Sequence, residues 1–244
     1  MSDRVSLVVG GTKGIGRAVT GRLLRQGPVV AAYRADEPAA AALERDLANR
    51  ALSTARADVS TKSGADGLVD AVLAEHGRLD VVVFAAVDAR LRSALKLTEQ
   101  DWHAVLASST TPMLWLAQRL AGLDPPPDHG RLIALTSPWS RRYVEGYGAI
   151  GPAKAALESL VVHLAAELAP LGTTVNAVSA GLVDTELMRS QVPAAHIDAL
   201  ARRTPTGRIG LPADLAGMVA YLAGTETDWV TGQILTLDGG YFLR

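Results

Sequence analysis

The two residues best suited to chemistry in this chain are a tyrosine and a lysine seven positions apart, Tyr147 and Lys154. A phenol can donate a proton to a substrate oxygen, and a nearby ammonium group lowers the pKa of that phenol. At 100° per residue both side chains fall on one face of a helix. Ile150, four positions before the lysine, can neither donate nor accept a proton. Tyr147 is therefore the candidate acid and Lys154 its candidate partner.

Two interpretations of this pair stay open. In the first, Tyr147 supplies the proton; in the second, the chain binds a cofactor but has lost its acid. A lone loop tyrosine is usually a packed aromatic with a solvated hydroxyl, and Tyr143 competes four residues earlier. Pro152 belongs in a first helical turn, so the helix is expected to begin near Ile150 with Tyr147 on the approach to it.

A glycine-rich loop at residues 10–16 lies between an apolar run and a segment with helical apolar spacing. Glycines allow a tight turn and let a pyrophosphate approach the N–H groups of a helix N-terminus, where the helix dipole favours anions. The strand, loop and helix context predicts nucleotide binding rather than a simple turn. The predicted contacts in this loop are Gly10, Thr12, Lys13, Gly14, Ile15 and Gly16.

The charges near the second strand favour one nicotinamide cofactor over the other. A carboxylate there would suit the ribose of NAD and repel a 2′-phosphate. This chain has Arg34 at that point and Lys13 in the glycine loop. Two cations near the adenosine ribose favour the phosphate of NADPH. The alternative is that both are solvated surface charges.

Strands and helices must alternate to position these residues. Apolar runs predict strands at 5–9, 29–33, 79–86, 131–136, 174–178 and 233–237. Thr98 and Asp101 have the spacing of a capping box at the start of a helix. The pattern predicts an α/β fold, a doubly wound parallel sheet of about seven strands with helices on both faces, in a single domain at 1–244.

Composition limits the function classes. The 244 residues carry a formal net charge of −1, which gives no basic excess for nucleic acid. The chain has no cysteine, and its five histidines show no ligand spacing, so no metal site is expected. No apolar run approaches the ~18 residues that span a bilayer, and no signal peptide is evident, so a cytoplasmic protein is expected.

These features resemble the short-chain dehydrogenase/reductase family over the whole chain. The likeness is carried by the glycine loop, Asp58-Val59, Asn176-Ala177-Val178, Thr185, Pro205-x-x-Arg208 and Asp238-Gly239-Gly240. The ordinary signature of that family is Tyr-x3-Lys, so the six residues between Tyr147 and Lys154 are a departure.

Four departures from the ordinary family pattern occur together. They are Phe84-Ala85-Ala86-Val87 for Asn-Asn-Ala-Gly, Ser109 for the catalytic asparagine, Ala180-Gly181 for Pro-Gly, and the displaced Tyr147. As a set they resemble the enoyl-acyl-carrier-protein reductases, a branch that uses Tyr-x6-Lys. The glycine loop keeps the Gly-x3-Gly-x-Gly spacing, so the closest likeness is to the NADPH-dependent type III enoyl reductases.

The resemblance implies roles for individual residues. Tyr147 would hydrogen-bond a thioester carbonyl and stabilise the enolate, and Lys154 would hold the nicotinamide ribose. Ser137 stands where the commoner enoyl reductases have a first tyrosine, so it retains a hydroxyl there. Thr185 would orient the carboxamide. The implied cofactor contacts outside the glycine loop are Arg34, Asp58, Val59, Ala85, Ala86, Lys154, Val183 and Thr185.

The resemblance also implies partners. Residues 186–204 occupy the position of the substrate lid, and Arg141-Arg142 could contact a phosphopantetheine or an acidic carrier protein, or form a solvated loop. The expected partner is a small acyl thioester, with no nucleic acid or membrane, in a homodimer or homotetramer.

Three functions stay open. The first is NADPH-dependent hydride transfer to Cβ of a trans-2-enoyl thioester. The second is a ketoreductase of specialised, polyketide-like metabolism, and the third is a non-catalytic NADP-binding homologue. In an enoyl thioester the charge develops on an oxygen two carbons beyond the hydride acceptor, so a donor displaced by one helical turn, ~5 Å, suits the longer reach.

Overall fold

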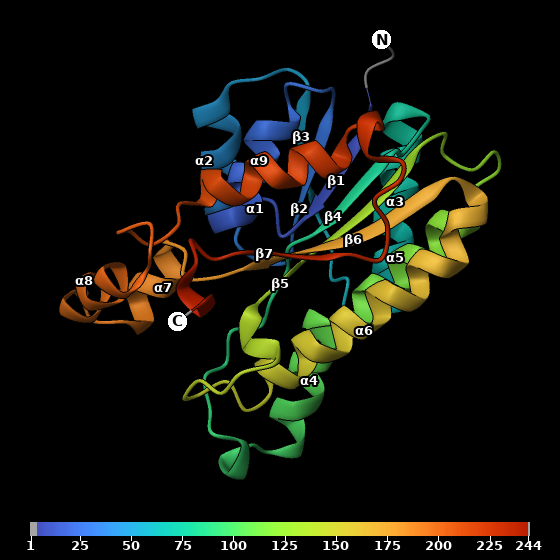
Figure 1. Cartoon of the computed structure of the whole chain (residues 1–244). Helices are drawn as coiled ribbons and strands as arrows, with labels where there is room; N and C mark the ends of the chain where they lie inside the picture. The colour runs from blue at the N-terminus through green and yellow to red at the C-terminus, as the bar shows by residue number, and fades with distance from the viewer. Residues whose placement is uncertain (1–3, 244) are drawn as a thin grey trace.

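The computed structural model describes residues 4–243 and contains one parallel sheet between two layers of helices (Figure 1). The strand order is β3-β2-β1-β4-β5-β6-β7, and every neighbouring pair is parallel. The strands are β1 Ser6–Val9, β2 Val29–Tyr33, β3 Leu52–Arg56, β4 Val81–Phe84, β5 Gly130–Thr136, β6 Thr173–Ala180 and β7 Ile234–Leu237. The order reverses between β1 and β4, where doubly wound sheets bind ligands at the strands' carboxyl ends.

Alternating side chains of the strands feed two separate cores. Leu7 and Val9 face one core, whereas Val8 between them faces the other. Helices α3 Lys62–His76, α5 Thr111–Ala121 and α6 Ile150–Leu168 cover the first face. Helices α1 Gly14–Leu23 and α9 Pro212–Ala223 cover the second, and α2 Glu37–Leu47 lies beside α1. The predicted doubly wound fold is confirmed.

The remaining helical segments lie around the carboxyl ends of the strands or in connections. Helix α4 Glu99–Ser109 packs against α5 and α6, while α7 Glu186–Gln191 and α8 Ala194–Arg203 project from the layered body (Figure 1). The 3-10 turns are η1 Ala94–Lys96, η2 Pro138–Ser140, η3 Ala169–Leu171, η4 Thr225–Thr227 and η5 Tyr241–Leu243. Residues 186–204, expected to form the lid, thus contain two short helices.

Two local predictions are confirmed by the structure. Thr98 and Asp101 form a reciprocal capping box at the start of α4. Helix α6 begins at Ile150, so Tyr147 lies on the approach to it and Pro152 falls in the first turn, where its missing N–H costs nothing. Within residues 4–243, no helix is both long enough and apolar enough to cross a membrane.

Candidate functional site

The glycine loop is shaped by backbone segments that touch one another. A Cβ on Gly16 would lie 2.0 Å from the carbonyl oxygen of Gly10, which leaves no room for any side chain. Gly10 has a positive φ of 80°, and a Cβ there would lie 3.0 Å from the backbone nitrogen of Ala86. The end of β4 therefore packs directly on the loop, which brings Ala85 and Ala86 to the predicted cofactor site.

The first turn of α1 offers free N–H groups to an anion. Lys13 is the N-cap residue, and its side chain makes no capping hydrogen bond. The unpaired N–H groups and the helix dipole suit a pyrophosphate. A Cβ on Gly14 would lie 3.7 Å from Thr185 Cγ2, so the turn after β6 borders the same space. Residues from three strand ends therefore converge where a dinucleotide would lie.

Thr185 and Val183 are held in place by the chain around them. Thr185 Oγ1 accepts a hydrogen bond of 3.1 Å from the Met188 N–H and caps α7. Its O–H proton can still be donated to a ligand. Val183 is buried and forms a parallel bridge with Gly210. Helix α7, the first of the two short helices in residues 186–204, thus begins at a predicted cofactor contact.

The charges near the adenosine end differ from the simple prediction. The ammonium of Lys13 forms an ion pair with Asp36, which raises the pKa of Lys13 and lowers that of Asp36. Asp36 also caps α2 by accepting from the Ala39 N–H at 3.0 Å. Asp36 is not among the predicted site residues, although an aspartate two residues before Pro38 is an N-cap signal. A 2′-phosphate would have to compete with this carboxylate for Lys13.

Asp58 and Arg34 lie close enough for their charges to interact. Hydrogen bonds from Ser60, and more weakly the charge of Arg34, lower the pKa of Asp58. Arg34 is exposed at the end of β2, and Val59 is buried after Asp58. Arg34 therefore lies just after the carboxyl end of β2, where the predicted contact to a 2′-phosphate requires a cation. It is not part of the glycine loop.

Lys154 is a buried cation on α6. Its side chain is only 6% exposed, and Nζ donates a hydrogen bond of 2.8 Å to the carbonyl oxygen of Leu135 in β5. Burial lowers the pKa of Lys154 to about 8, and the charge of Glu158 opposes this effect. The ammonium therefore stays mostly protonated at neutral pH. It is tied to the end of the strand that leads to Ser137.

Tyr147 lies half-buried at the start of α6. Its carbonyl accepts the Gly151 N–H at 2.9 Å, and its ring packs on the apolar cluster that includes Val105, Ile150 and Ala153. Burial raises the pKa of Tyr147, whereas the sequence argument expected Lys154 to lower it. The expectation fails because burial dominates at Tyr147, while Lys154 is itself desolvated and directs Nζ to Leu135. The phenol is therefore protonated at neutral pH.

The loop after β4 holds Tyr147 from the other side. The Arg92 N–H donates to Gly146 at 2.7 Å, and the Gly148 N–H donates to Arg92 at 3.0 Å. These bonds form a parallel bridge between Arg92 and Tyr147. Tyr143, the competing tyrosine, is 89% exposed. The structure therefore places Tyr147, and not Tyr143, against the packed wall of the site.

The two serines of interest have different surroundings. Ser109 is fully buried, and its Oγ accepts a hydrogen bond of 3.2 Å from the Asp88 N–H, which fixes the same loop after β4. Ser137 follows β5 directly and precedes η2, and its side chain does not cap that turn. The hydroxyl of Ser137 is thus the more available of the two for a ligand.

Sequence reasoning missed the role of Glu158, which lies one helical turn after Lys154. This buried carboxylate accepts hydrogen bonds from Thr136, Ser140 and Arg141. Its spacing of four from the lysine was the available signal. Among the described residues, no group of three or more histidines and carboxylates is arranged to hold a metal ion.

Comparisons with known proteins agree with this architecture. A family model described as Enoyl-(Acyl carrier protein) reductase matches residues 9–242. The chain is 33% identical to 1-cyclohexenylcarbonyl-CoA reductase of Streptomyces collinus, over 97% of this chain and 86% of that protein. It is 31% identical to (2S)-[(R)-hydroxy(phenyl)methyl]succinyl-CoA dehydrogenase subunit BbsD of Thauera aromatica, over 98% and 97%.

A solved structure gives the same result. The short-chain dehydrogenase/reductase from Serratia marcescens BCRC 10948 superposes with a TM-score of 0.88 at 30% identity, covering 98% of this chain and 97% of that one. Fold, glycine loop and family match point the same way. The chain belongs to the short-chain dehydrogenase/reductase family of oxidoreductases, which use nicotinamide cofactors.

Proposed function

We propose that the protein is an NADPH-dependent reductase that transfers hydride to Cβ of a trans-2-enoyl thioester. The observation that carries this proposal is that Tyr147, half-buried, packs on an apolar cluster directly before the helix that bears Lys154. Ile150 occupies the place of the ordinary family acid and is buried in the wall beside Tyr147. A single phenol therefore serves as donor, three residues further from the lysine along the chain than in Tyr-x3-Lys.

Each chain residue has a defined task in this reaction. Bound NADPH supplies the hydride. The protonated hydroxyl of Tyr147 donates a hydrogen bond to the thioester carbonyl, and this bond strengthens as negative charge develops on that oxygen. The ammonium of Lys154 binds the ribose hydroxyls and adds positive charge nearby. The apolar cluster beneath Tyr147 excludes water and fixes the ring.

The displacement of the phenol supports an enoyl rather than a keto substrate. In a ketone the oxygen that gains charge is bonded to the carbon that accepts hydride. In an enoyl thioester that oxygen lies two carbons further along the chain. A donor set three residues before Ile150, on the approach to α6, would supply this added distance, since one helical turn spans ~5 Å.

One relative supports the same reaction class. The name 1-cyclohexenylcarbonyl-CoA reductase describes a substrate in which a ring double bond is conjugated to a thioester carbonyl. That is the electronic arrangement proposed here. The second relative is also named for a CoA thioester, so an acyl thioester is the substrate class.

Ketone reduction is the second candidate. BbsD is named as a dehydrogenase of a hydroxy-substituted acyl-CoA, and it covers nearly the same span of this chain at similar identity. In that reaction Tyr147, assisted by Ser137, would protonate a ketone oxygen beside the hydride acceptor. In enoyl reduction the C=C bond is reduced, and a solvent proton then adds to Cα of the enolate that Tyr147 stabilises. In ketone reduction the C=O bond is reduced, and the proton of Tyr147 ends on the oxygen beside the hydride acceptor.

The test is NADPH oxidation measured with crotonyl-CoA and acetoacetyl-CoA in parallel, with NADH as the cofactor control. Turnover of crotonyl-CoA but not acetoacetyl-CoA is the expected result. Turnover of acetoacetyl-CoA alone would replace the proposal with ketone reduction. NADPH binding without turnover of either would favour a non-catalytic homologue.

NADPH preference is proposed from Arg34 and Lys13. Arg34 is exposed at the carboxyl end of β2, where the adenosine ribose of a dinucleotide lies in this family. Lys13 stands at the N-terminus of α1, and its pairing with Asp36 is an exposed ion pair that a phosphate can exchange with little loss.

A further inference from the structure

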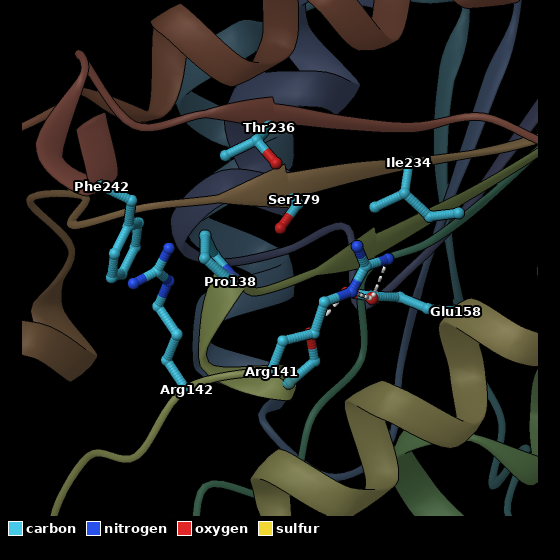
Figure 2. Close-up of a pocket in the computed structure, with 9 residues that line it drawn as sticks. Pro138, Arg141, Arg142, Glu158, Ser179, Ile234, Thr236 and Phe242 are labelled. Carbon is cyan, nitrogen blue, oxygen red and sulfur yellow. Dashed lines mark hydrogen bonds and ion pairs between the residues drawn. The ribbon is translucent and has the colours of Figure 1, made fainter.

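The buried carboxylate of Glu158 accepts hydrogen bonds from several residues of the chain segment that leads from β5 toward Tyr147. Glu158 is 5% exposed and accepts hydrogen bonds from Thr136 Oγ1 at 2.9 Å and Ser140 Oγ at 2.8 Å. Nε and Nη2 of Arg141 each lie 2.9 Å from its other oxygen, and Figure 2 shows the guanidinium turned back onto it. One carboxylate thus holds three residues of a six-residue stretch, 136–141.

The same helix holds β5 one turn earlier. Lys154 donates to the carbonyl of Leu135, and Glu158 accepts from the hydroxyl of the next residue, Thr136. These two contacts fix the register between α6 and the end of β5. Ser137, which follows Thr136, is therefore placed relative to Lys154 by Glu158.

The segment from residue 140 to residue 148 is held at two places, and Tyr147 lies within the second of them. Glu158 holds the upstream end of the segment at Ser140 and Arg141, and Arg92 holds the downstream end at Gly146 and Gly148. Between them the chain is solvent-exposed, as Tyr143 shows. A segment held at both ends by buried or backbone contacts keeps a fixed path, whereas loss of one anchor lets it open locally.

We propose that Glu158 is a positioning residue that ties the segment carrying Ser137 and Tyr147 to the helix carrying Lys154. The role rests on the proposed function, in which Tyr147 is the donor. Because a shift of about 1 Å in a reacting group can cost on the order of 100-fold in rate, one carboxylate can matter without touching substrate.

Glu158 also affects the pKa of Lys154 through its negative charge. Arg141 faces it from the loop, Lys154 from its own helix, and Arg142 stands across a pocket of about 350 Å³ that Glu158 also lines (Figure 2). The negative charge of Glu158 raises the pKa of Lys154, against the effect of burial. Removing that charge must lower the pKa of Lys154, so the alkaline limb of the pH–rate profile moves to lower pH.

Two variants separate anchoring from charge. Glu158→Gln removes the charge and one acceptor oxygen but keeps the size of the side chain. Arg141→Ala removes one anchoring contact at an exposed side chain and leaves the charge of Glu158 in place. Glu167→Gln makes the same chemical change on an exposed position of the same helix and is the matched control.

The measurements are amide hydrogen exchange over residues 137–147, NADPH affinity by fluorescence titration, and kcat against pH with whichever thioester the wild type reduces. Glu158→Gln is expected to speed exchange in 137–147 and to lower kcat about 10-fold, with NADPH affinity retained. Its alkaline limb shifts to lower pH. Arg141→Ala speeds exchange without that shift, and Glu167→Gln changes neither.

Unchanged exchange over 137–147 in Glu158→Gln would overturn the positioning role, even if the alkaline limb moved, because the effect would then be one of charge alone. If the wild type reduces no thioester tested, the proposed function fails. Hydrogen exchange still decides whether Glu158 holds the segment.

Discussion

The nucleotide half and the catalytic half of this site are built in different ways. In the glycine loop, backbone touches backbone, and Gly16 has no space for even one methyl group beside Gly10. Around Tyr147, position depends on segments distant in the sequence, through the side chain of Glu158 and the backbone bridge at Arg92. The first half is fixed by close backbone packing, whereas in the second half one buried side chain and one backbone bridge hold an exposed segment. Substitutions in the glycine loop should therefore weaken NADPH binding, whereas substitutions around Tyr147 should slow the reaction and leave NADPH binding intact.

The largest expected effect comes from adding a methyl group to the glycine loop. In Gly16→Ala the new Cβ would lie 2.0 Å from the Gly10 carbonyl oxygen, so the loop must move. NADPH affinity should fall at least about 100-fold, since the pyrophosphate contacts depend on that backbone. Fluorescence titration measures the affinity.

Gly21→Ala is the matched control on the same helix. Its Cβ would meet only Leu47 side-chain atoms at 3.8 Å, an ordinary contact. It should keep NADPH affinity and raise the free energy of unfolding by up to about 1 kcal/mol, because alanine favours helix. Equal NADPH affinity in the two variants would mean that the loop is not packed as described.

The next effect tests the catalytic half. Tyr147→Phe keeps the ring in its apolar cluster and removes the hydroxyl. The value of kcat/KM should fall about 10²- to 10⁴-fold with NADPH affinity unchanged. Tyr143→Phe, at an exposed position, should retain full activity. Equal loss in both variants, or none in Tyr147→Phe, would remove the phenol from the mechanism.

These contrasts match what sequence could predict. The fold, the glycine loop and the start of α6 at Ile150 followed from apolar runs, glycine spacing and Pro152, all of them local signals. The raised pKa of Tyr147, the Lys13–Asp36 pair and the contacts of Glu158 did not, because each depends on segments brought together only by folding. The roles assigned to Ser137 and Thr185 remain predictions.

A third prediction concerns the cost of burying Lys154. Its pKa of about 8, below the ordinary 10.5, corresponds to at most roughly 3 kcal/mol of destabilisation at neutral pH. Lys154→Met should abolish activity but raise the free energy of unfolding by about 1–3 kcal/mol at pH 7.

The difference in unfolding free energy between Lys154→Met and the wild type should depend on pH. Between pH 8 and 10.5 the unfolded lysine holds its proton while the folded one loses it, so wild-type stability rises with pH in this window. The advantage of Lys154→Met should therefore shrink there, as measured by urea unfolding at pH 7 and pH 9.5. A variant less stable than the wild type at pH 7 would contradict the buried-cation interpretation.

The smallest effect concerns cofactor choice. Arg34→Ala should lower the preference for NADPH over NADH about 10-fold, since one charge-assisted contact to the 2′-phosphate is lost. Arg25→Ala serves as the control, because Arg25 lies in the turn between α1 and β2, at the amino end of β2 rather than its carboxyl end. The ratio of kcat/KM for the two cofactors measures the preference. An unchanged ratio in Arg34→Ala would leave the discrimination to Lys13 alone.

The most direct test of enoyl reduction follows the hydride itself. The wild-type protein is incubated with trans-2-enoyl-CoA and NADPH deuterated at C4 of the nicotinamide on each face in turn, and the product is examined by NMR. The proposal predicts deuterium at C3, the former Cβ, of a saturated thioester for one of the two labelled faces. A parallel incubation uses the 3-keto thioester. The proposal would be contradicted if the enoyl substrate were returned unchanged and deuterium were found only at the carbinol carbon of the 3-hydroxy thioester formed from the 3-keto substrate.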